Sequence, residues 1–200
     1  MARPPRPERK TELLEQILGF LLDKTLADLT FRSLADGLGI SSYVLVYHFG
    51  NREQLVAEII RGIEARFDIH HPGGERLSLP EIVLWARAVF ASSLDDRGRH
   101  LQRLEFEAAV QDAVADHPRG NSVAGYLGWC DFLSTWLEQE GQPREEAAVR
   151  GRMFVSAVIG ILYDYVICGD REAVTASFEL LVDAFARQLE ATQPSLEGQR

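Results

Sequence analysis

The chain has 200 residues, enough to bury a sizeable core in one large domain or two small ones. Charged residues (26%) and apolar residues (46%) occur at near-average levels for globular proteins, which excludes a chain disordered throughout. A net charge of -9 excludes a surface that is basic all round, yet residues 1–52 carry seven basic and six acidic side chains. This distribution suits a protein that meets DNA only through its first quarter.

The chain begins with a polar segment. Residues 1–7 contain three prolines and two arginines, and we expect a flexible basic arm that is either an extra DNA contact or an ordinary terminus. No apolar run follows, so we expect no secretory signal. The longest apolar run, 153–163, is too short to span a bilayer, and we expect a cytoplasmic protein.

An amphipathic packing helix is predicted from about Glu8 to Thr25. Beyond it, residues 30–54 have the pattern of a helix-turn-helix that enters a longer helix. Thr30 and Ser41 are suited to cap the two short helices, and Gly39 allows the tight turn between them. A capping box formed by residues 51 and 54 then predicts the start of the long helix.

The second short helix has an outward face rich in aromatic and hydroxyl groups. Its members are Ser42, Tyr43, Val46, Tyr47 and His48. The opposite edge, with Leu45 and Phe49, is apolar and predicted to be buried. We interpret the outward face as a DNA-recognition surface.

The order and spacing of these residues resemble the tetracycline-repressor (TetR) family of bacterial transcription regulators. The matching pattern is Thr30, Leu34-Ala35, Gly39-Ile40-Ser41, Leu45, Tyr47-His48-Phe49, Arg52 and Leu55. The chain departs from it at Val46, where many members have Tyr, and at Arg52, where Lys is common. The resemblance implies an all-α fold, with a helix-turn-helix DNA-binding domain over residues 1–50. Residues 51–200 would form a helical effector-binding and dimerisation domain.

DNA binding needs phosphate contacts that position the head and base contacts that specify the site. The phosphate candidates carry hydroxyl, imidazole or guanidinium groups, and they are Thr30, Arg32, Tyr47, His48 and Arg52. The base-edge candidates are Ser42 and Tyr43, with Val44 against a thymine methyl group; Ser41 completes the set. Packing against the first helix is the alternative role for Tyr47 and His48.

The remainder is predicted to be helical over about 52–69, 81–94, 99–115, 121–139, 143–168 and 171–191. The helix over 52–69 leaves the head, so a tilt at its far end would move the recognition helix. The last two helices carry more apolar surface than a monomer can bury, which favours a two-fold dimer through a four-helix bundle. The interface candidates are Gly160, Val174, Phe178, Leu181 and Phe185.

The resemblance also implies a small-molecule effector bound between the middle helices. Aromatic residues are the candidates to line its site, with plain core as the alternative role: Trp85, Phe106, Trp129, Phe132 and Tyr163. Arg87 is either a polar anchor for the ligand or part of a solvated face. We expect an apolar or aromatic ligand.

We expect no metal, no cofactor and no enzyme. The five histidines form neither an i, i+4 pair nor a cluster with the two cysteines, and no phosphate loop or nucleophile motif occurs. Glu105, Glu107 and Glu138 are expected to be ordinary surface charges. Two hypotheses remain: a dimeric repressor released by its ligand from a near-palindromic operator, or a helical small-molecule-binding or interaction protein without DNA binding.

Overall fold

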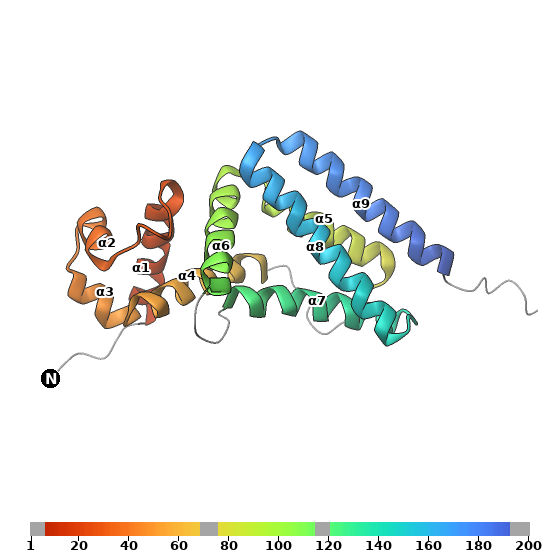
Figure 1. The fold of residues 1–200 in the computed structure, drawn as a ribbon, viewed down its shortest axis with the longest axis horizontal. Helices are drawn as coiled ribbons and strands as arrows, with labels where there is room; N and C mark the ends of the chain where they lie inside the picture. Colours follow the sequence, from red (N-terminus) through yellow and green to blue (C-terminus); the bar gives the residue numbers. More distant parts are fainter. Residues whose placement is uncertain (1–6, 69–75, 115–120, 193–200) are drawn as a thin grey trace, which may run out of the picture. The chain divides into compact units, whose positions relative to one another are not determined.

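The computed structural model describes residues 7–68, 76–114 and 121–192, and all regular structure in these ranges is helical (Figure 1). The helices are α1 (Pro7–Phe20), α2 (Phe31–Leu38), α3 (Ser42–Phe49), α4 (Arg52–Asp68), α5 (Leu79–Ser92), α6 (Asp96–Val114), α7 (Asn121–Gln139), α8 (Arg144–Cys168) and α9 (Arg171–Thr192). The all-α fold class is confirmed. The predicted arm, apart from its last residue, lies outside the described residues.

The chain divides into two compact units that alternate along the sequence. Unit 1 comprises residues 1–69 and 95–126, and unit 2 comprises residues 70–94 and 127–200. Helix α6 therefore belongs to the same unit as the helix-turn-helix, although it lies far from it in the sequence. The functional division into residues 1–50 and 51–200 stays a prediction.

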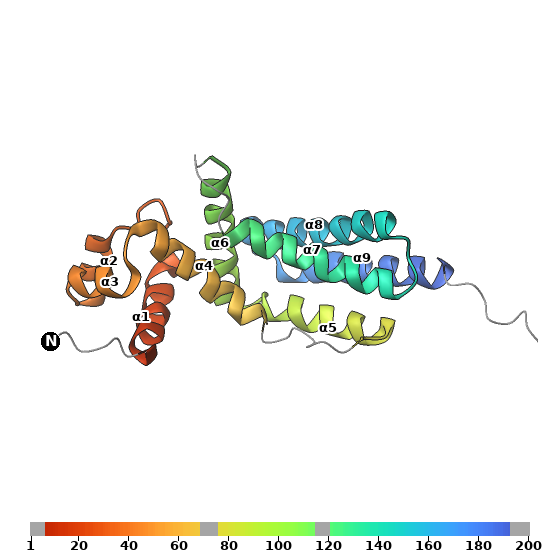
Figure 2. The same cartoon turned by 90° about the horizontal axis from the view of Figure 1, so that it is seen from below.

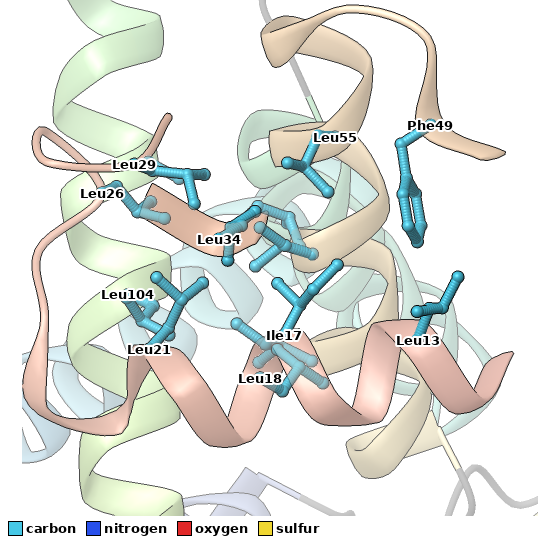
Figure 3. Close-up of a cluster of buried hydrophobic side chains, with 14 of the residues drawn as sticks. Leu13, Ile17, Leu18, Leu21, Leu26, Leu29, Leu34, Phe49, Leu55 and Leu104 are labelled. Carbon is cyan, nitrogen blue, oxygen red and sulfur yellow. The ribbon is translucent and has the colours of Figure 1, made fainter. Parts of the chain in front are cut away.

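The core of unit 1 is a cluster of leucine and isoleucine side chains from α1, α2, α3, α4 and α6. Figure 3 shows Ile17 and Leu18 of α1, Leu34 of α2 and Leu104 of α6 pointing into this cluster. Each of these side chains is fully buried. Because Leu13, Ile17 and Leu18 lie on one face of α1, its amphipathic stripe packs against the other helices, as predicted.

The end of α1 differs from the prediction. The sequence pattern predicts a helix to about Thr25, but α1 ends at Phe20 and tightens into a 3₁₀ turn, η1 (Leu21–Asp23). The carbonyl of Leu21 accepts a hydrogen bond from Arg103 Nη2 of α6 at 2.9 Å. A contact from a distant helix thus satisfies a carbonyl at the helix end, which periodicity cannot reveal.

In unit 2, α5 packs on α9, and α8 runs antiparallel beside α9 (Figures 1 and 2). The rings of Phe90 and Phe178 stack with centroids 3.9 Å apart. Arg87 Nε donates to Glu179 at 2.7 Å and its Nη2 to Asp183 at 3.0 Å. These bonds raise the pKa of Arg87 above its usual value, chiefly through the hydrogen bond to Glu179. Arg87 therefore joins α5 to α9.

The predicted dimer-interface residues of α9 need correction. Val174 and Phe178 are essentially fully buried within the chain, and Phe185 is 8% exposed. Phe185 packs on Phe154 of α8, with ring centroids 4.6 Å apart. These three side chains form the core of unit 2 and are unavailable to another subunit. Leu181 is partly covered, whereas Gly160 is exposed.

Helix α8 is longer than the apolar run that lies within it. By length and composition alone it could cross a membrane, so the short run does not by itself exclude a span. Only 17% of its most apolar 18-residue window is buried in the chain. The core of unit 2 covers one side of α8, and the other side exposes apolar side chains.

Candidate DNA-recognition surface

Helix α3 has one buried face and one exposed face. Leu45 is fully buried and Phe49 nearly so, and both belong to the core of unit 1. On the other side, Tyr43 is 74% exposed, Val46 47% and Tyr47 45%. The predicted outward face is thus exposed apart from the half-buried His48, and it carries two phenol rings.

The turn between α2 and α3 is built as the sequence predicts. Gly39 adopts φ 66°, in the left-handed region where a residue without Cβ is favoured. Ser41 then caps α3, because its Oγ accepts a hydrogen bond from the Tyr43 N–H at 3.2 Å. Ser42, exposed in the first turn, is held at the start of the recognition helix.

The turn after α3 is equally constrained. Gly50 has φ 72°, and a Cβ there would lie 1.9 Å from Gln54 Oε1. The Asn51 N–H donates to Gln54 Oε1 at 3.1 Å, and the Gln54 N–H donates to Asn51 Oδ1 at 2.8 Å. This reciprocal capping box, predicted from the sequence, fixes how α4 follows α3.

Two predicted phosphate contacts lie at the start of α2. Thr30 caps the helix, with its Oγ1 accepting from the Ser33 N–H at 3.0 Å. Arg32 is exposed and makes no ion pair or hydrogen bond with any described residue. Its guanidinium is therefore available to an external anion.

Two further candidates, Val44 and His48, are half-buried. Val44 packs against the core of unit 1, which leaves only part of its side chain for a base contact. His48 lies edge-on to Tyr47, with ring centroids 5.2 Å apart. Packing within the head thus accounts for part of the environment of Val44 and of His48.

Arg52, at the start of α4, has two backbone partners that the sequence did not predict. Its Nε donates to the Leu29 carbonyl at 3.0 Å, and its Nη2 donates to the Leu26 carbonyl at 2.6 Å. Two of its three nitrogens therefore serve the connection between α1 and α2. Arg52 thus holds this connection, and because its side chain is also exposed, its phosphate contact stays a prediction.

Two residues of α6 contact the same connection, and sequence reasoning missed both. Arg103 Nη2 donates to the Leu21 and Lys24 carbonyls at 2.9 and 2.8 Å. Glu107 accepts from the Leu26 N–H at 2.6 Å and also pairs with Arg103. The expectation that Glu107 is an ordinary surface charge is therefore wrong. In the sequence, this i, i+4 pair has the same appearance as a pair on a solvated helix face.

Three of the predicted effector contacts come together in unit 2. The ring centroids of Trp85 and Phe132 lie 5.1 Å apart, those of Trp85 and Trp129 5.7 Å, and those of Trp129 and Phe132 6.4 Å. All three side chains are half-buried. Tyr163 is 54% exposed on α8, so we correct its assignment from an interior ligand contact to a surface residue. Phe106 lies on α6 in unit 1, and its role stays a prediction.

Comparisons with known proteins relate the chain to transcription regulators. It is 41% identical over 54 residues to the HTH-type transcriptional repressor KstR2 of Mycobacterium tuberculosis, and the match covers 27% of each chain. The chain thus spans about a quarter of the length of the curated relatives it matches. No family model matches.

Solved structures extend the likeness over nearly the whole chain. SmeT, the repressor of the Stenotrophomonas maltophilia multidrug efflux pump SmeDEF, has TM-score 0.71 and 15% identity, covering 90% of this chain and 89% of SmeT. A TetR-family transcriptional regulator from Pectobacterium atrosepticum has TM-score 0.65 and 14% identity, covering 97% of this chain and all of that one.

The fold and the exposed α3 face define an all-helical protein of the helix-turn-helix class. The resemblance to the TetR family read from residues 30–55 is confirmed to this extent: the first quarter of the chain matches a named HTH-type repressor, and the fold is that of solved TetR-family regulators. These relatives are named as repressors and regulators, in agreement with the prediction that the chain is not an enzyme.

Proposed function

We propose that this chain is a dimeric, ligand-responsive transcriptional repressor. Two copies of α3 bind a near-palindromic DNA operator in the cytoplasm, and a small apolar or aromatic molecule releases them. The observation that carries the proposal is the exposed face of α3, because Tyr43 and Tyr47 stay outside while Leu45 and Phe49 complete the core.

The contacts proposed for this face follow from exposure. Ser42 and Tyr43, in the first turn of α3, read base edges in the major groove. Arg32 and the hydroxyl groups of Thr30 and Tyr47 position the head on phosphates. The net charge of the chain does not oppose this role, because its acidic excess lies beyond residue 52.

The proposed dimer forms through the exposed side of α8 and α9. Exposed positions of α8 repeat at alternating steps of four and three residues, the spacing of a helix-packing seam, and they are Val149, Met153, Ser156, Gly160, Tyr163 and Ile167. A Cβ at Gly160 would meet nothing within 4 Å in the chain, so another helix has room to approach. On α9, Leu180 is 68% exposed and extends the surface. A dimer would set its two recognition helices about 34 Å apart.

The proposed effector site contains Trp85, Trp129 and Phe132. Three aromatic rings in mutual contact favour an apolar or aromatic ligand over a charged one. Ligand binding would act on the head by favouring a spacing of the two recognition helices that does not fit adjacent grooves. The predicted tilt of α4 is one element of this change.

Selection from a random duplex library with the purified full chain tests the proposal. The expected product is an enriched near-palindrome whose half-sites are centred about 10 base pairs, or a multiple of that, apart. If no sequence is enriched even at low salt, DNA binding is refuted, and the helical ligand-binding alternative takes its place.

A charge-matched pair of variants makes the test specific to the head. Arg32→Ala is expected to lower the affinity for the selected duplex and to reduce the slope of log Kd against log salt by about one per subunit. Arg171→Ala removes the same charge from an exposed position of α9 and is expected to leave the slope unchanged.

A further inference from the structure

Both backbone polar groups of one residue in unit 1, Leu26, are held by side chains from two different helices. The Leu26 N–H donates to Glu107 Oε2 of α6 at 2.6 Å, and the Leu26 carbonyl accepts from Arg52 Nη2 of α4 at 2.6 Å. The Leu26 side chain is fully buried in the core (Figure 3). Arg103 completes the arrangement through its ion pair with Glu107. We call these four residues the Leu26 junction.

The junction side chains bond several backbone groups of a segment with little regular structure. Between η1 and α2, the Lys24 carbonyl accepts from Arg103 and the Leu29 carbonyl accepts from Arg52. Hydrogen bonds from charged groups are stronger than neutral ones, so these side chains largely determine where the segment lies. Leu29 immediately precedes Thr30, the N-cap of α2. The position of α2, and through Gly39 that of α3, thus depends on the junction.

We infer that the Leu26 junction sets the position of the recognition helix α3 and, through it, the affinity of the head for DNA. Arg52, Arg103 and Glu107 are positioning residues in this account, and none of them contacts DNA. The inference rests on the proposed function, because the controlled property is DNA affinity.

Substituting Glu107 tests the inference, because loss of positioning and loss of negative charge change the DNA affinity in opposite directions. Removing a carboxylate from the head lowers its negative charge, which by electrostatics alone strengthens DNA binding. Loss of positioning weakens it. In the full chain we therefore expect Glu107→Ala to weaken binding of the selected duplex by about tenfold. Glu107→Gln removes the same charge but keeps an oxygen acceptor, and is expected to recover much of the loss.

Amide hydrogen exchange tests the junction without DNA. In Glu107→Ala, exchange in peptides spanning residues 21–30 is expected to rise by about tenfold or more, while exchange in α8 and α9 stays unchanged. The matched control is Arg97→Met, because Arg97 on α6 pairs with Glu15 of α1 at 3.0 Å without touching the connection. This control is expected to change neither the exchange of 21–30 nor the DNA affinity.

Arg52 provides an independent test of the junction. If it positions the connection, Arg52→Met lowers DNA affinity and leaves the slope of log Kd against log salt unchanged, unlike Arg32→Ala. Because Arg52 and Glu107 act on the same residue, Leu26, Arg52→Met combined with Glu107→Ala is expected to lose less affinity than the two single losses multiplied. A reduced slope for Arg52→Met would restore a phosphate contact and overturn its positioning role.

The failures are distinguishable. If the unaltered chain binds the selected duplex and Glu107→Ala binds it equally or more tightly, the inference is overturned and the proposed function stands. If the unaltered chain binds no duplex, the proposed function fails and the inference with it. Should Glu107→Ala not fold, Glu107→Gln decides, since a smaller loss of affinity with faster exchange over 21–30 supports the junction, and unchanged or tighter binding overturns it.

Discussion

The helix-turn-helix and the α8–α9 pair treat their apolar side chains in opposite ways. In the helix-turn-helix, Leu34 and Leu45 are fully buried, and the exposed face of α3 ends in hydroxyl groups and rings. Along α8, Val149 is 69% exposed, Met153 55% and Ile167 59%. One region has completed its core within the chain, and the other has not.

The difference indicates what each surface can meet. Tyrosine and serine side chains can stay hydrated until they exchange water for the polar groups of DNA. A stripe of valine, methionine and isoleucine has no such partner and gains free energy only when another apolar surface covers it. We therefore assign DNA to the first surface and a second copy of the chain to the other. The following predictions test this contrast, from the largest expected effect to the smallest.

The completeness of the core in unit 1 predicts the largest loss. Leu34→Ala leaves a cavity in a fully buried site and is expected to cost about 3 kcal/mol of unfolding free energy, measured by urea denaturation. Leu84→Ala, at a position of α5 that is 69% exposed, is the control and should stay within about 0.5 kcal/mol. Equal losses would contradict the burial described for these residues.

The exposed stripe of α8 predicts a loss of association. Met153→Glu places a charge in the proposed interface and is expected to weaken dimerisation by about a hundredfold or more, some 2.7 kcal/mol, in sedimentation equilibrium. Ala148→Glu adds the same charge at an exposed position outside the stripe and should leave the dimer intact. A monomeric unaltered chain, or a Met153→Glu dimer of full affinity, would refute this interface.

The recognition face predicts a selective loss of DNA binding. Tyr43→Ala removes a side chain of α3 that is 74% exposed, and it is expected to lower affinity for the selected duplex by about tenfold, without changing the salt slope or the dimer. Fluorescence anisotropy at several salt concentrations provides the measurement. If Tyr43→Ala binds the duplex as the unaltered chain does, Tyr43 does not read bases.

The caps predict smaller effects on stability. Thr30→Ala removes the hydroxyl that accepts the Ser33 N–H and should cost about 1 kcal/mol of unfolding free energy. Thr30→Ser keeps the hydroxyl and serves as its control. An unchanged urea midpoint for Thr30→Ala would show that α2 does not depend on its cap.

The smallest expected effect depends on pH. The Ser78 side chain and N–H donate to Glu81 Oε2 at 2.6 and 2.8 Å, and these bonds, the side-chain one first, lower the pKa of Glu81. A lowered folded-state pKa contributes stability above the unfolded-state pKa of about 4.3, which is lost as pH falls through the folded-state value. Glu81→Gln should therefore be less stable than the unaltered chain at neutral pH, with the gap closing below about pH 4. A pH-independent gap in urea denaturation would contradict the shift.

The helix-turn-helix could be predicted from the sequence because the residues that define its helix ends act locally. Thr30, Gly39 and Ser41 act within a few residues of the helix ends that they define, so their types and order predict the helix-turn-helix directly. The reciprocal capping of Asn51 and Gln54 is equally local. The all-α class follows from the helical periodicity of the remaining segments.

Contacts between distant segments could not be read in this way. The partners of Arg52 and Glu107 are backbone groups of Leu26 and Leu29, and backbone groups carry no sequence signal. The α9 stripe containing Phe178 shows in the sequence as an apolar face, but periodicity does not say whether the same chain or another covers it. Burial within the chain settles that point only once α5 and α8 are in place.

The central claim is that this chain reads DNA as a pair of heads joined through α8 and α9. Sedimentation velocity of the selected duplex with the unaltered chain tests it most directly. The account predicts two chains on each near-palindromic duplex, with affinity that falls steeply as salt rises and a complex that Met153→Glu abolishes at the same concentration. A single chain bound to each duplex at saturation, or a DNA affinity that salt does not affect, would contradict it.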